Sequence, residues 1–224
     1  LSELSFDTSV VFGQVANSSP VFTSNASFTV AENQTSAATI AVTDADNDSI
    51  SFSLSGTDAA FFAIASSGAL TFNSAPDYEI KESYSLIITA SDGTSSVSQT
   101  ISINISNVNE VPQISALSST QSPDENQTTI VTVSSSDPDA NTSLTYSVSG
   151  TDSSLFAISS SGVLTFKTAP DYETPGDANA DNSYQINVVV SDGSLSVTQA
   201  ITIQVQNVAD LISGVAVDGY VAGA

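Results

Sequence analysis

The chain has 224 residues, and its 24 acidic residues are set against only two basic ones, for a formal charge of −22 and a pI of about 4.1. With no basic surface to neutralise phosphate groups, nucleic acid and an anionic membrane surface are excluded as partners. The lack of cysteine and histidine excludes disulfides, thiol catalysis and zinc–thiolate sites.

The first half of the chain carries the two-residue period of β-strands. Residues 1–19 are expected to form an upstream tail, and Pro20 opens the first copy of the pattern. Apolar residues then alternate with polar ones over 50–54, 84–88 and 101–105, which predicts strands with one buried face. Asp92-Gly93 separates two long alternating runs and predicts a hairpin.

The second half repeats this pattern. Alternation returns over 144–148, 184–188 and 201–205, and Asp192-Gly193 again separates two long runs. We predict an all-β protein of two tandem seven-stranded Greek-key antiparallel sandwiches arranged end to end. The expected boundaries are a first repeat over 20–106, a linker over 107–112, a second repeat over 113–210 and the start of a truncated following module over 211–224.

Seven residues, six of them acidic, return in the same order in the two copies. Glu32, Asp44, Asp46, Asp77, Tyr78, Glu79 and Asp92 correspond to Glu125, Asp137, Asp139, Asp171, Tyr172, Glu173 and Asp192. The offset grows from 93 to 94 to 100 residues, as one-residue and six-residue loop insertions would produce in two copies of one domain. Carboxylates on loops are the hard oxygen ligands that calcium prefers, and bound calcium would offset their mutual repulsion.

The order of these motifs resembles the tandem cadherin repeat in its bacterial cadherin-like form, over residues 20–210. Ala31-Glu32-Asn33 resembles the family's first motif and Asp77-Tyr78-Glu79 its mid-domain Asp-x-Glu. Residues 107–111 (Asn-Val-Asn-Glu-Val) occupy the linker, while Asp137-Pro138-Asp139 and Ser191-Asp192-Gly193 resemble the two motifs of the next repeat. The resemblance implies immunoglobulin-like sandwiches whose motifs close round calcium ions at the joint.

The resemblance implies an interdomain site for two or three calcium ions, with ligands from Glu32, Asp77, Glu79, Asn107, Asn109, Glu110, Asp137, Asp139, Asn141 and Asp192. The linker departs from the family pattern at two positions. Asn107 stands where the family has Asp, and Glu110 where it has a second Asp, so one charge is lost and one ligand is lengthened. We expect the central ion to bind more weakly or to be absent.

Two weaker half-sites are expected at the outer ends. Asp44, Asp46 and Asp92 form one of them, but its linker would be residues 14–18, which contain no acid, so we expect it to be empty or weakly filled. The other half-site consists of Glu125, Asp171, Glu173 and Asp210. It awaits a further repeat.

Two other acidic segments invite a metal interpretation. The segment 44–48 imitates the start of an EF-hand loop, but Ser49 stands in place of the required glycine and Ser55 in place of the final glutamate, so this interpretation is rejected. Asp177, Asn179 and Asp181 lie in the six-residue insertion, where a solvated loop and a local ion are both open. Any single Asp here is also a common turn residue.

These features favour a calcium-rigidified adhesive or spacer segment of a large bacterial extracellular protein, secreted or at the cell surface, whose partners are adjacent repeats. One alternative is a carbohydrate-binding module for polysaccharide, although the chain has no Trp and only six Tyr to stack on sugars. Another is calcium-dependent homotypic association, for which the insertion 175–182 is the asymmetric element. Without His, Cys or a phosphate-binding loop, we expect no enzyme.

Overall fold

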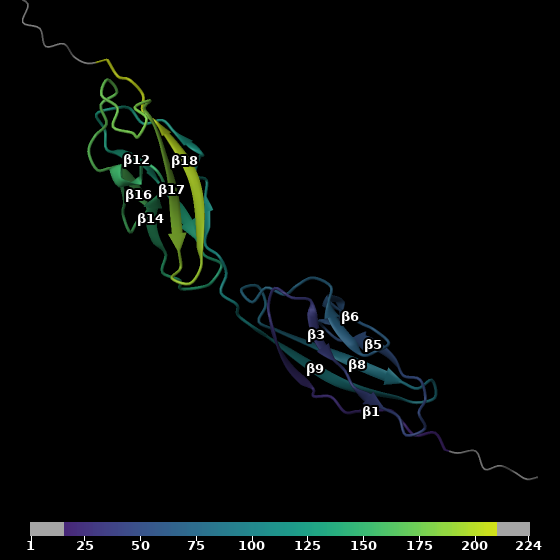
Figure 1. Cartoon of the computed structure of the whole chain (residues 1–224). Coiled ribbons are helices and arrows are strands. Elements are labelled where there is room, and N and C mark those ends of the chain that lie inside the picture. Colours follow the sequence, from purple (N-terminus) through teal and green to yellow (C-terminus); the bar gives the residue numbers. More distant parts are fainter. Residues whose placement is uncertain (1–15, 210–224) are drawn as a thin grey trace, which may run out of the picture. The chain divides into compact units, whose positions relative to one another are not determined.

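The computed structural model describes residues 16–209, which form two compact units that divide between Val108 and Asn109 (Figure 1). We call residues 16–108 repeat 1 and residues 109–209 repeat 2. Most of the expected upstream tail (1–15) and the expected following module (211–224), together with Asp210, lie outside the described residues. The repeat boundaries proposed from the sequence therefore stay predictions.

Repeat 1 consists of nine short strands and one turn of 3-10 helix, η1 (Ala59–Phe61). The strands are β1 (Val21–Phe22), β2 (Ser27–Ala31), β3 (Ser36–Thr39), β4 (Val42–Thr43), β5 (Ser51–Ser55), β6 (Phe62–Ile64), β7 (Ala69–Phe72), β8 (Ser83–Ser91) and β9 (Ser96–Ser106).

Repeat 2 has the same elements in the same order, with η2 (Ser153–Leu155) in place of η1. Its strands are β10 (Gln113–Ser115), β11 (Thr120–Gln121), β12 (Thr129–Thr132), β13 (Ser134–Ser136), β14 (Thr145–Ser149), β15 (Phe156–Ile158), β16 (Val163–Phe166), β17 (Ser183–Ser191) and β18 (Ser196–Gln204).

Each repeat is a two-layer sandwich, as predicted. In repeat 1 a four-stranded sheet in the order β2-β9-β8-β5 packs on a three-stranded sheet β3-β7-β6 and the small pair β1-β4. Seven strands result when β1 with β2, and β3 with β4, are each counted as one interrupted strand. One pairing in each repeat is parallel, β2 with β9 and β11 with β18, because the first strand crosses to the second sheet before it pairs with the last.

The alternating runs form the core, as the two-residue period predicts. In repeat 1 the buried set includes Tyr84, Leu86 and Ile88 from β8 and Ile101 and Ile103 from β9. The corresponding residues of β17 and β18 are buried in repeat 2. Each repeat therefore has its own hydrophobic core.

The predicted Asp-Gly hairpins are confirmed, and a further turn requires glycine. Antiparallel pairing of β8 with β9 and of β17 with β18 places Asp92-Gly93 and Asp192-Gly193 in the hairpin loops. Gly68 has a φ of +82°, and a Cβ there would lie 2.1 Å from the carbonyl oxygen of Ile40, so only glycine fits this turn. In residues 16–209 no helix has the length and apolar character needed to cross a membrane.

Candidate metal-binding ends of the repeats

The acidic motifs of each repeat gather at the two ends of its last strand. In repeat 1, β9 begins just after the Asp92 hairpin and ends just before Asn107, and β2 runs parallel to β9 and ends beside it at Ala31. We call the hairpin side the entry end and the other the exit end. The entry ends hold Asn17, Asp44, Asp46 and Asp92 in repeat 1 and Asn109, Asp137, Asp139 and Asp192 in repeat 2; the exit ends hold Glu32, Asp77, Glu79 and Asn107, and Glu125, Asp171, Glu173 and Asn207.

The exit end of repeat 1 is organised by Glu32, which is buried. Its carboxylate accepts hydrogen bonds from the backbone N–H of Tyr78 at 2.7 Å and of Val108 at 2.8 Å. These bonds hold the Asp77–Glu79 loop and the start of the linker against the end of β2. As a result, oxygen atoms of Glu32, Asp77 and Glu79 lie within 4.8 Å of one another, close enough to share a cation.

The exit end of repeat 2 repeats this arrangement. Glu125 is buried and accepts hydrogen bonds from the backbone N–H of Tyr172 at 2.9 Å and of Val208 at 2.8 Å. These two bonds, that from Tyr172 first, hold the pKa of Glu125 below its ordinary value. Oxygen atoms of Glu125, Asp171 and Glu173 also lie within 4.8 Å of one another.

The entry end of repeat 2 is joined by short hydrogen bonds. Asp137 Oδ1 accepts from the backbone N–H of Asp139 at 2.9 Å, and Asp139 Oδ2 accepts from that of Glu110 at 2.8 Å. Asp192 Oδ1 caps its hairpin through the N–H of Leu195, and its Oδ2 accepts from Asn109 Nδ2 at 2.8 Å. The Asn109 bond and then the hairpin N–H groups lower the pKa of Asp192.

The entry end of repeat 1 is built to the same plan, although its linker lacks an acid. Asn17 Nδ2 donates to Asp92 Oδ2 at 3.1 Å, and the backbone N–H of Ser18 donates to Asp46 Oδ2 at 2.7 Å. The N–H of Ser95, followed by Asn17, lowers the pKa of Asp92. Asn17 was not predicted, because residues 14–18 contain no acid; the shared Asn-x-x-Pro spacing of residues 17–20 and 109–112 is the signal that identifies it.

Two further residues lie in the loops of the entry ends. Asp48, set aside together with the EF-hand interpretation, places an oxygen within 4.8 Å of oxygens of Asp44 and Asp46. Asn141, a candidate ligand, has a left-handed φ of +64°, as Asn47 does at +62° in repeat 1. Asparagine tolerates this conformation better than most residues, so the turn favours it at this position, and its role as a ligand stays a prediction.

The same oxygen is left without a donor in both entry ends. Within the described residues, Oδ2 of Asp44 and Oδ2 of Asp137 are buried and have no hydrogen-bond partner, while Oδ1 of each accepts a backbone N–H. A carboxylate oxygen removed from water without a donor costs free energy. A bound cation removes this cost, so the donor set fits a hard divalent ion such as calcium.

The carboxylates of the insertion in repeat 2 do not have this character. Asp177 is buried, and its two oxygens accept the backbone N–H groups of Asp181 at 3.0 Å and Asn182 at 3.1 Å. Asp181 accepts from Ser183 N–H and Asn179 Nδ2. Burial alone would raise the pKa of Asp177, but the N–H donors outweigh it and lower the pKa. These carboxylates already face donors, which supports the solvated-loop interpretation over a local ion.

The fold and the acidic ends define a tandem β-sandwich repeat protein with carboxylates clustered at the ends of each sandwich. A family model described as the cadherin domain matches the chain twice, over residues 26–106 and 118–206. The chain therefore belongs to the cadherin-domain family. No curated protein matches the chain.

Solved structures of cadherins are similar in fold. Human protocadherin-24 EC1-2 (form II) is 23% identical, covers 84% of this chain and 99% of its own, and has a TM-score of 0.60. Drosophila N-cadherin EC1-4 is 20% identical, with 85% of this chain and 50% of that chain covered and a TM-score of 0.55. These similarities support the two-sandwich architecture.

Proposed function

We propose that the chain is a calcium-binding cadherin repeat pair, in which the exit end of repeat 1 and the entry end of repeat 2 supply ligands to two or three calcium ions at the 107–110 joint. The proposed ligands are nine of the ten residues predicted from the sequence; Asn107 is left out because its amide donates to Glu79. The linker is continuous through Asn107, Val108 and Asn109, so the two ends belong to adjacent segments of one chain.

One observation carries this proposal: the unpartnered, buried Oδ2 of Asp137, repeated at Asp44. A turn residue needs only the backbone bonds that Oδ1 accepts, and nothing in turn formation requires a second oxygen without a donor. A bound cation accounts for it, because calcium is held by six to eight oxygen ligands at about 2.3–2.6 Å.

Calcium would change the mechanical state of the pair. The formal charge of −22 makes the carboxylate clusters repel one another without a cation. Extracellular calcium modules typically bind calcium with a Kd of about 10⁻⁴ to 10⁻³ M. At a calcium concentration a hundredfold above the Kd, one site stabilises the calcium-bound state by about 2.7 kcal/mol. Because ligands would come from both repeats, binding would restrict the motion of one repeat against the other.

The test is a calcium titration by calorimetry with small-angle scattering on the same samples. Wild type should bind two or three ions saturably, and the distance distribution should narrow. Asp137→Asn removes the charge of the unpartnered oxygen at the joint and should weaken binding there at least about tenfold. No binding at millimolar calcium, or binding without a change in scattering, would contradict the proposal.

Asp44→Asn is the matched control. Asp44 makes the same bond with its second-next residue and has the same unpartnered oxygen, but it lies at the entry end of repeat 1. Its substitution should leave the scattering response at the joint intact. Magnesium in place of calcium separates a geometric site from general charge screening, because magnesium dehydrates reluctantly and demands a tighter octahedral shell.

We further propose that this pair acts as an adhesive or spacer segment of a large bacterial extracellular protein, since cadherin-domain membership points to extracellular repeats that interact with adjacent repeats. Homotypic association is one alternative. It predicts that the sedimentation coefficient in calcium rises with protein concentration, whereas a spacer segment predicts no change. The insertion proposed as its interface has an internal role, because Ala178 N–H donates to Asp152. Polysaccharide binding stays a prediction, and a pull-down with and without chelator tests it.

A further inference from the structure

Each exit end contains an asparagine amide bonded to one carboxylate of the acidic cluster. Asn107 Nδ2 donates to Glu79 Oε1 at 3.1 Å, and Asn207 Nδ2 donates to Glu173 Oε1 at 2.7 Å. The contact is the same in both repeats, although the insertion lengthens the separation of the two partners from 28 to 34 residues. The bond therefore does not depend on the sequence separation of its partners and is a common feature of the exit ends.

The amide donor and a cation compete for the same oxygen. Glu79 is one of three carboxylates whose oxygens lie within 4.8 Å of one another, so these groups repel when no cation is present. An N–H donor relieves part of that repulsion, because it brings positive partial charge to an anionic oxygen. A calcium ion that binds Glu79 Oε1 on the side from which the amide donates displaces this hydrogen bond.

We propose that Asn107 and Asn207 are calcium-threshold residues: each amide stabilises the calcium-free exit end and thereby raises the calcium concentration at which that end fills. This inference rests on the proposed calcium binding and concerns its regulation. In this role Asn107 opposes calcium binding, because its amide donates to Glu79. The sequence instead predicted that Asn107 binds calcium through its side-chain oxygen. The two roles predict opposite effects of removing the side chain.

The test compares wild type with Asn107→Ala in a residue-resolved calcium titration. The backbone amides of Val108 and Val208 bond directly to Glu32 and Glu125, so their NMR shifts report the two exit ends separately in one sample. If the amide competes, Asn107→Ala should lower the apparent Kd at Val108 about three- to tenfold, the range of one net hydrogen bond. The Kd at Val208 should not change.

The outcomes are distinct. A higher Kd at Val108 in Asn107→Ala would identify Asn107 as a ligand and would overturn the inference. An unchanged Kd at Val108 would also overturn it, because the amide would then have no effect on calcium binding. Wild-type protein without a calcium-dependent shift would instead overturn the proposed function itself. Because Asn107 is exposed, Asn107→Ala should fold, and Asn107→Ser provides a second small variant with the same expected direction.

Asn207→Ala is the matched variant in repeat 2. It removes the same bond from Glu173 and should shift the Kd at Val208 with no change at Val108. Equal shifts at both reporters in either variant would show a general effect on charge or stability, and would overturn the local competition. A second readout is calcium-free stability, which should fall in both variants since each Glu loses a donor.

Discussion

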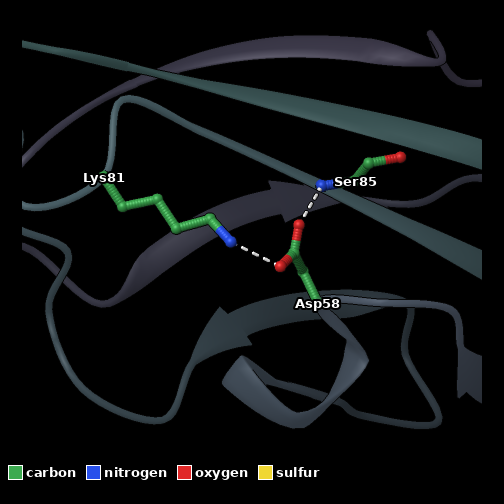
Figure 2. A network of polar contacts seen from close by, with 3 residues as sticks. All are labelled: Asp58, Lys81 and Ser85. Atoms are coloured by element: carbon green, nitrogen blue, oxygen red, sulfur yellow. Dashed lines mark hydrogen bonds and ion pairs between the residues drawn. The ribbon is translucent and has the colours of Figure 1, made fainter.

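Each repeat has a buried aspartate directly before its 3-10 turn, and the two repeats satisfy this carboxylate with different hydrogen-bond donors. In repeat 1, Asp58 Oδ1 pairs with Lys81 Nζ at 2.5 Å and its Oδ2 accepts from Ser85 N–H at 2.7 Å (Figure 2). In repeat 2, Asp152 Oδ2 accepts from Gln185 N–H at 2.7 Å, but its Oδ1 accepts from the backbone N–H of Ala178 at 3.1 Å.

The difference shows what the six-residue insertion does. By motif alignment, Pro175 stands where repeat 1 has Lys81, and proline has no charge to offer. The insertion brings a backbone N–H to Asp152 instead, and the buried Asp177 shapes that loop. A buried carboxylate must be satisfied; repeat 1 uses an ion pair and one backbone N–H, whereas repeat 2 uses two backbone N–H groups.

Asp58→Ala should have the largest effect on this comparison. It leaves Ser85 N–H without its acceptor and Lys81 without its partner, at a cost of about 2–4 kcal/mol in the stability of repeat 1. Hydrogen exchange of the Leu86 amide in β8, measured with increasing urea, follows repeat 1. The equivalent Ile186 amide in β17 follows repeat 2 and is the internal control, which should not change. Equal loss in both repeats would contradict separate cores.

Asp177→Ala should have a smaller effect, confined to repeat 2. Without the Asp177 carboxylate, the loop no longer holds Ala178 N–H against Asp152, so repeat 2 should lose about 2 kcal/mol. The same exchange measurement checks this at Ile186. Asp181→Ala, at an exposed residue of the same loop, is the control and should cost less than about 1 kcal/mol. If both variants cost the same, the link from Asp177 to Asp152 is wrong.

The strands and hairpins were predictable because their signals are local. The two-residue alternation in β8 and β9 reports burial of one face, and Asp-Gly reports a loop that needs a left-handed glycine. The repeated acids also identified the clusters at Glu32, Asp77 and Glu79, because their order is a pattern of residue types.

The contacts that complete the ends were not predictable in the same way. Asn17 and Ala178 act through an amide or backbone N–H, and a backbone donor leaves no mark in residue type. Lys81 could not be paired from the sequence, since its partner Asp58 lies 23 residues earlier. The fold brings these groups together, and local sequence patterns do not report that proximity.

Lys81→Met should have the smallest effect on stability. The pH dependence of that effect tests most directly whether the Lys81 charge stabilises Asp58 in repeat 1. The Lys81 bond first, and then Ser85 N–H, hold the pKa of Asp58 below its ordinary value of about 3.9. The unfolded chain therefore takes up this proton at higher pH than folded repeat 1. The stabilisation is fully present above the ordinary pKa and is lost as the pH falls through the lower, folded one.

Lys81 Nζ lies 5.1 Å from the centroid of the Phe61 ring and 4.7 Å from that of the Tyr84 ring. Lys81→Met keeps an apolar side chain over these rings but removes the charge. Because the Lys81 side chain is 35% exposed, solvent screens the pair, and we expect a loss of only about 1 kcal/mol at neutral pH. That loss should shrink as the pH falls below about 3.9, since protonated Asp58 no longer needs the cation. Lys167→Met, whose ammonium donates to the Ser154 carbonyl, should show no such pH dependence. Urea unfolding followed at Leu86 between neutral and acid pH measures the difference, and a gap between variant and wild type that stays constant with pH would show that Lys81 acts by packing alone.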